Sequence, residues 1–166
     1  MRLIKEETIM AIELVRIDDR LIHGQVATTW TRNYEIEQIL IIDDKTRNDP
    51  IAQSVANYAV PVGVKVMIFG VDQFAGVLKK TEIKKRTMLL FTNPIDILRL
   101  VNEGLQISEV NAGGMRFNET RRRLSKAISV TDAEDEAFKK LMDKGIHINV
   151  QMVPKDPRVD YGTLAK

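Results

Sequence analysis

Short apolar runs alternate with amphipathic segments along the chain, and the two periods predict strands followed by helices. Runs of strand length lie at residues 11–15, 38–42, 64–69, 86–91, 107–111 and 146–153. Helical spacing begins at residue 26 and recurs at 50–59, at 71–80, from 94 to Gly104, and from 132 to near Gly145. The repeated strand–helix unit predicts an α/β fold with a single open, mostly parallel twisted sheet that has helices on both faces.

Capping residues mark several of the predicted helix starts. Asp49 and Asn93 each precede a proline, which predicts an N-cap followed by proline at the first helical position. Thr131 and Glu134 have the spacing of a capping box. Ligands of open parallel sheets bind beyond the carboxyl ends of the strands. We therefore expect one edge of the sheet to carry the loops at His23, 43–44, Gly70, 92–93 and 113–114.

Length and composition fit one compact domain over residues 10–166. The chain has 166 residues, of which 44% are hydrophobic, and no Pro-, Gly- or Ser-rich linker divides it. Residues 1–9 have no clear period or cap, so we expect a disordered N-terminal extension and a folded start at Met10. The first ten residues lack the apolar centre of a secretory signal, and the apolar runs are too short to span a membrane.

Cysteine content and net charge limit the classes of site and of partner that the chain can have. The absence of cysteine excludes disulfides, thiolate zinc sites and a cysteine phospho-acceptor, and favours a cytoplasmic protein. A net charge of only +2 gives little support to nucleic-acid binding. Two histidines remain as candidates for nucleophilic chemistry.

Residues 16–25, Arg-Ile-Asp-Asp-Arg-Leu-Ile-His-Gly-Gln, combine the groups that handle phosphate. His23 lies where the first predicted strand gives way to a helix, and Gly24 lacks a side chain that would block a ligand's approach to the backbone. Neutral imidazole is a usable nucleophile near pH 7. A phosphoryl group on it brings about two negative charges. The guanidinium groups of Arg20 and Arg16 can neutralise these charges.

Other residues can orient the imidazole and hold the phosphate. Asp18 or Asp19 can accept a hydrogen bond from one ring N–H and so fix the tautomer. The free N–H groups at the helix start, at Gly24 and Gln25, can bind phosphate oxygens, and Gly113–Gly114 can form an anion nest beside them. By themselves these residues are equally compatible with a solvated turn of surface ion pairs and, at the two glycines, a tight loop with positive φ.

The string RIDDRLIHGQV closely resembles the active-site segment of the IIB subunits of the mannose/fructose/sorbose family of the bacterial phosphoenolpyruvate-dependent sugar phosphotransferase system. Further stretches resemble that family's landmarks in the same order, within a resemblance that covers about residues 10–161: 43–45, 48–50, 61–66, 93–101, 111–115 and 125–130. Arg116 stands where family members often carry histidine, and residues 118–120 replace a glycine- and lysine-rich stretch. The resemblance implies that His23 is transiently phosphorylated.

The resemblance also implies a function, a place in the cell and a set of partners. It implies a cytoplasmic phosphoryl carrier that accepts the group from a histidine of a IIA domain and passes it to a mannose-, fructose-, sorbose- or amino-sugar-class substrate. In enzyme terms this is a protein-Nπ-phosphohistidine–sugar phosphotransferase. The sugar enters through membrane subunits IIC and IID, which would hold the protein at the inner face of the membrane. No metal or organic cofactor is expected, because transfer between two histidines mainly requires alignment. Homo-oligomer formation stays open.

Two other functions fit the residues. A Mg²⁺-dependent phospho-aspartate receiver would also place acidic pairs after its strands, as at 18–19 and 43–44. A sensor could bind sugar phosphates at the same edge without covalent chemistry.

Three further features are assigned to structure rather than to chemistry. His147 lies on the polar side of an alternating strand, opposite residues 146, 148 and 150, so we expect a surface residue. Trp30 is expected to pack in the core or at its edge. Arg121–Arg123 is expected to be a solvated loop, with docking to an acidic partner protein as the alternative.

Overall fold

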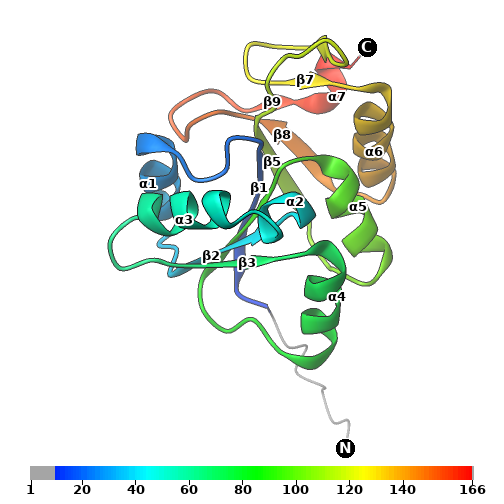
Figure 1. Ribbon diagram of the computed structural model, residues 1–166. Helices are drawn as coiled ribbons and strands as arrows, with labels where there is room; N and C mark the ends of the chain where they lie inside the picture. The colour runs from blue at the N-terminus through cyan, green and yellow to red at the C-terminus, as the bar shows by residue number, and fades with distance from the viewer. Residues whose placement is uncertain (1–9, 166) are drawn as a thin grey trace, which may run out of the picture.

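Figure 1 shows the protein as a computed structural model that describes residues 10–165. Its strands are β1 (Ile12–Asp18), β2 (Gln38–Ile42), β3 (Lys65–Phe69), β4 (Thr87–Phe91), β5 (Glu109–Gly114), β6 (Arg122–Arg123), β7 (Ser129–Val130), β8 (His147–Val150) and β9 (Val159–Asp160). Its helices are α1 (Gly24–Asn33), α2 (Asp44–Arg47), α3 (Pro50–Ala59), α4 (Val71–Lys80), α5 (Pro94–Asn102), α6 (Asp132–Asp143) and α7 (Tyr161–Leu164).

Seven of these strands form one open sheet in the order β3-β2-β4-β1-β5-β8-β9. All neighbours in it pair in parallel except β9, which runs antiparallel to β8. The strands β6 and β7 form a separate antiparallel pair. The predicted fold class, a mostly parallel open sheet with helices on both faces, is confirmed.

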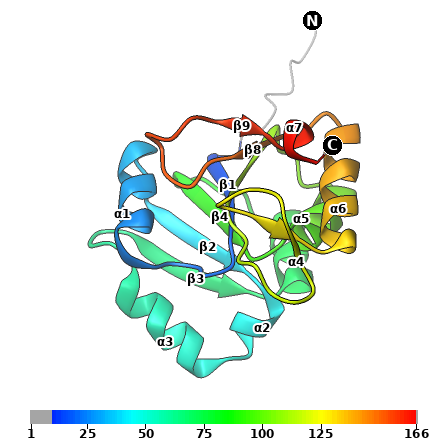
Figure 2. The ribbon, with the colours of Figure 1, turned by 90° about the horizontal axis from the view of Figure 1, so that it is seen from above.

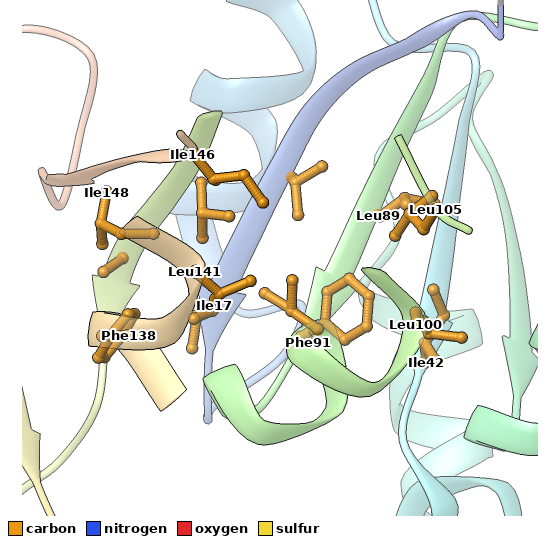
Figure 3. Packing of buried hydrophobic residues seen from close by; sticks show 14 of the residues in the cluster. Ile17, Ile42, Leu89, Phe91, Leu100, Leu105, Phe138, Leu141, Ile146 and Ile148 are labelled. Atoms are coloured by element: carbon orange, nitrogen blue, oxygen red, sulfur yellow. The ribbon is translucent and has the colours of Figure 1, made fainter. Parts of the chain in front are cut away.

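Helices cover the two faces of the sheet unequally (Figure 2). On one face α4, α5 and α6 pack through Phe74, Leu100 and Phe138 against a large core that includes Ile17 and Phe91 (Figure 3). The opposite face carries a smaller core that includes Ala27 and Trp30 of α1 and Ala56 of α3. Because side chains alternate along a strand, β1 sends Leu14, Arg16 and Asp18 toward the α1 face, whereas Val15 and Ile17 join the large core.

The capping residues found in the sequence do cap the helices. Asp49 accepts hydrogen bonds from the N–H groups of Ile51 and Ala52 at 3.0 and 3.2 Å. Asn93 accepts one from Asp96 N–H, and Thr131 and Glu134 form a complete capping box at the start of α6. Since each cap satisfies N–H groups that have no partner inside the helix, these starts can be recognised from sequence.

Several boundaries differ from those predicted. Strand β1 continues through Asp18, beyond the predicted end at residue 15. It is flanked by β4 and β5, and their backbone hydrogen bonds form whether the side chain is polar or apolar. Helix α1 begins at Gly24 rather than residue 26, and β5 extends through Gly113 and Gly114, which were expected in a loop. The elements α2, β9 and α7 are only two to four residues long, too short to show a hydrophobic period in the sequence. The expectation for residues 1–9 lies outside the described residues.

Candidate phosphoryl-transfer site

The site is built at the carboxyl edge of the sheet, around the loop between β1 and α1. The loop closes on a hydrogen bond from Leu21 N–H to the Asp18 carbonyl oxygen at 2.9 Å, and Leu21 has a left-handed backbone with φ of 61°. His23 is the N-cap residue of α1, and its side chain is 26% exposed. Gly24 has φ of +49°, a conformation that glycine adopts at little cost. The histidine is therefore presented to solvent on a sharply turned segment.

Asp18 holds the imidazole of His23. Its Oδ2 atom lies 3.1 Å from Nε2 of His23, and its side chain is only 1% exposed. Its other oxygen, Oδ1, accepts a hydrogen bond from the backbone N–H of Arg20 at 3.0 Å. In a neutral imidazole, a contact between Nε2 and an accepting carboxylate oxygen favours the tautomer with the proton on Nε2 and the lone pair on Nδ1. Of the two acids proposed to orient the ring, Asp18 is the one in contact with it.

Arg16 is buried and fully engaged inside the fold, which contradicts the prediction that it neutralises a phosphate directly. Its guanidinium donates to Asn111 Oδ1 at 2.5 Å, to Asp18 Oδ2 at 3.1 Å and to the Met152 carbonyl at 3.1 Å, and it stacks over Trp30 at 5.0 Å. Burial lowers the pKa of Arg16 although Asp18 opposes the shift. The residue is buried because it belongs to β1, inside the sheet, rather than to the loop. It acts on the site only by fixing Asp18.

Gly113 and Gly114 have a different role from the expected one. They belong to β5 and have no positive φ, so they form neither an anion nest nor a tight loop. A side chain at Gly113 would overlap the Arg16 guanidinium, and a Cβ atom at Gly114 would lie 2.9 Å from Oδ1 of Asp18. The two glycines leave the space in which Arg16 and Asp18 lie against the neighbouring strand.

Asp19 forms its hydrogen bonds with Arg116 and Arg121 and so ties the loop to the segment after β5. It accepts hydrogen bonds from the backbone N–H of Arg116 at 2.9 Å and from Nη1 of Arg121 at 2.8 Å. Arg121 also donates two bonds to the Glu134 carboxylate, and its side chain is 11% exposed. The expectation of a solvated loop is therefore wrong for Arg121. No local pattern predicts this cluster, because its members are far apart in the sequence.

The N-terminus of α1 differs from those of the other helices within residues 10–165. Side chains accept hydrogen bonds from first-turn N–H groups of α2, α3, α4, α5, α6 and α7. No described side chain does so for α1, and its first turn has no acidic residue. The N–H groups at Gly24 and Gln25, beside His23, therefore stay available to an anion. The open space around Gly24 leaves room for one.

The remaining sequence assignments are mostly supported. Trp30 is buried and donates from Nε1 to the Met152 carbonyl at 2.9 Å. His147 is exposed at the start of β8, while Ile148 and Val150 are buried. Asp43 is the N-cap of α2 and also accepts a hydrogen bond from Thr92, so both of its carboxylate oxygens are engaged within the fold. Within the described part of the chain, no three acidic or histidine side chains are grouped to hold a metal ion.

Known proteins resemble this chain in sequence and in fold. A family profile described as the PTS system sorbose subfamily IIB component matches residues 12–166. The mannose-specific EIIAB component of Escherichia coli K12 is 40% identical over 151 residues, which cover 90% of this chain and 47% of that protein. The chain thus spans about half the length of this relative. The fructose-specific EIIB component of Bacillus subtilis is 37% identical, over a stretch that covers 92% of this chain and 94% of that protein.

Solved structures agree with the sequence relatives. The IIBSor domain of the Klebsiella pneumoniae sorbose permease superposes with a TM-score of 0.84 at 34% identity, over 92% of this chain and 94% of that domain. None of the helices in residues 10–165 is long and apolar enough to cross a membrane. The match along nearly the whole chain and the shared fold show that this protein belongs to the sorbose-subfamily IIB components of the phosphotransferase system.

Proposed function

We propose that His23 is the phospho-acceptor of a phosphoryl carrier, and that Nδ1 is the atom that bonds to phosphorus. The observation that carries the proposal is the pairing of His23 with a buried carboxylate at the uncapped N-terminus of α1. Asp18 holds the proton on Nε2, which leaves a nucleophilic lone pair on Nδ1. The free N–H groups of α1 lie at the same place to receive the phosphate oxygens.

In the first step, the Nδ1 lone pair attacks phosphorus on a phosphohistidine of a IIA domain. The Nδ1–P bond forms as the bond to the donor's nitrogen breaks, and that nitrogen keeps the electron pair. The new phosphohistidine carries about two negative charges. The Arg20 side chain is about one-third exposed. Of its guanidinium nitrogens only Nε interacts with Asp18, at a long 3.4 Å from Oδ1. Its terminal nitrogens donate no hydrogen bond within the described residues, and in this scheme they bind the phosphate by a planar fork.

In the second step, a sugar hydroxyl oxygen attacks the same phosphorus and the Nδ1–P bond breaks, with the hydroxyl proton lost to the ring nitrogen or to water. We propose the mannose, fructose, sorbose and amino-sugar class as substrates, on the printed specificities of the relatives. In this scheme the protein is a protein-Nπ-phosphohistidine–sugar phosphotransferase. It works on the cytoplasmic side of the membrane beside membrane subunits IIC and IID. Neither step calls for a metal or organic cofactor, since alignment and charge compensation suffice.

The proposal is tested by labelling with a phosphorylated IIA domain and, independently, with phosphoramidate as a small donor. His23→Ala is expected to abolish both labels, while His147→Ala, which replaces the exposed histidine of β8, keeps both. The label should be acid-labile and stable to alkali, as a phosphohistidine is. A hydroxylamine-sensitive label would point to an aspartyl phosphate instead. A label retained in His23→Ala, or found on another residue of the parent, would refute the assignment.

A further inference from the structure

A small basic hollow lies beside the site, on the side of the segment that follows β5. It has a volume of about 180 Å³, and its lining includes Arg20, Arg116, Arg123 and Lys126 but no carboxylate. Arg20 joins this hollow to the site, because its backbone N–H bonds to the same Asp18 carboxylate that holds His23. We call the four cationic residues together with Phe117 the basic rim.

Much of the positive charge of the basic rim has no partner within the described residues. Arg123 and Lys126 are exposed and form no ion pair in residues 10–165. Arg116 pairs with Asp19 through Nε, yet its side chain remains 67% exposed. The Arg123 guanidinium stacks over the ring of Phe117, 5.5 Å from its centre, and Phe117 is 56% exposed. An aromatic ring with a cation on its face is a surface suited to contact with a protein partner.

A second, larger hollow also borders the His23 loop, at Asp19 and Leu21, and has the other charge balance. Its volume is about 720 Å³, and it is lined by five carboxylates and three cations, one of which is Arg116 of the basic rim. Asp43 and Asp49 cap helix starts and Glu134 completes the capping box of α6, so these three acids are fixed in place. A partner with negative charge around its reacting group is therefore attracted on the side of the basic rim and repelled on the other.

We propose that the basic rim is the docking surface for the phosphoryl donor, a IIA domain whose phosphohistidine is bordered by acidic residues. This inference rests on the proposed function, which supplies the partner. The donor arrives with about two negative charges on its phosphoryl group. Contact at Phe117, Arg123 and Lys126 sets its orientation, and Arg20 is the member of the rim that shares the Asp18 carboxylate with His23. The basic rim thus determines both the direction from which the donor approaches and how tightly it binds.

The test reverses charge on the rim and at a matched distant place. Arg123→Glu/Lys126→Glu is compared with Lys84→Glu/Lys85→Glu, which changes the net charge equally in the exposed loop before β4, at the other end of the parallel strands. The second-order rate of transfer is measured with a phosphorylated IIA domain that labels the parent. At low salt we expect a loss of roughly ten-fold or more for the rim variant and under about two-fold for the loop variant. The gap should close near 1 M salt, where the screening length is about 3 Å.

Labelling by phosphoramidate separates this inference from the proposed function. The rim variant should accept phosphate from this small donor at the parent's rate, since the substituted side chains do not touch His23. Equal transfer rates from the IIA domain for the rim and loop variants would overturn the docking surface while leaving the phospho-acceptor intact. A parent protein that neither donor labels would instead refute the proposed function. Lys126→Glu alone, a single exposed substitution, gives the same comparison if the double variant is poorly folded.

Discussion

Asp18→Asn is the substitution that most directly tests how the site is held together. Asp18 is buried and receives contacts from Arg16 at 3.1 Å, from Arg20 N–H at 3.0 Å and from His23 at 3.1 Å. Asparagine keeps the shape and one acceptor oxygen but removes the negative charge. Arg16 would then be a buried cation with only neutral hydrogen-bond partners, the amide of Asn111 and two backbone carbonyls.

Breaking one side of a buried ion pair costs about 3–5 kcal/mol, because the remaining charge is left uncompensated. In a domain of this size each kilocalorie lowers the melting temperature by roughly 2–4 °C. We therefore expect Asp18→Asn to unfold about 6–20 °C earlier than the parent. In urea at 25 °C the midpoint should fall with the slope unchanged. Phosphoramidate labelling of His23 should also be slower, because the tautomer is no longer fixed.

The control is Asp19→Asn, the same chemical change one residue later. Asp19 is more exposed than Asp18, and Arg121 keeps its two bonds to Glu134 when Asp19 is changed. A loss of only about 1 kcal/mol is expected there. Adding Arg16→Met to Asp18→Asn should recover stability, with a coupling energy of about 0.5–3 kcal/mol. If Asp18→Asn costs no more than Asp19→Asn, the carbonyls alone compensate Arg16 and the reasoning fails.

Three further predictions concern the surroundings of the site. Arg20→Lys keeps the charge but loses the planar fork, so transfer to and from His23 should slow while the melting temperature stays near the parent's; equal rates would limit Arg20 to a surface ion pair. Gly113→Ala places a methyl group on the Arg16 guanidinium and should destabilise by about 1–3 kcal/mol in urea, whereas Gly76→Ala, inside α4 with open space around it, should stabilise by about 0.5–1 kcal/mol. Burial, followed by repulsion from Asp43 and Asp44, raises the pKa of Asp96 above its ordinary 3.8 against the hydrogen bond from Asn93. Protonated Asp96 thus contributes stability that is lost as the pH rises through its folded pKa. The melting temperature of Asp96→Asn should therefore rise relative to that of the parent between about pH 3.5 and pH 7. If the difference between the two melting temperatures is the same at both pH values, the sign of the pKa shift is contradicted.

The sequence by itself determined the alternation of strands and helices, the caps at Asp49, Asn93 and Thr131, and the position of His23 between a strand and a helix. These features depend on local periods and on short-range hydrogen bonds, which leave their pattern in neighbouring residues. The string around His23 was enough to indicate the family, which the relatives and solved structures confirm.

The tertiary structure alone decided which side chains surround His23. A strand reverses the side of its residues at every step, so the exact end of β1 determined that Arg16 is buried and that Asp18 contacts His23. The role of Gly113 and Gly114 depends on the neighbouring strand, and that of Arg121 depends on an acid in α6 and another in the His23 loop. Such long-range pairings arise from the order of strands in the sheet, which local sequence patterns do not encode.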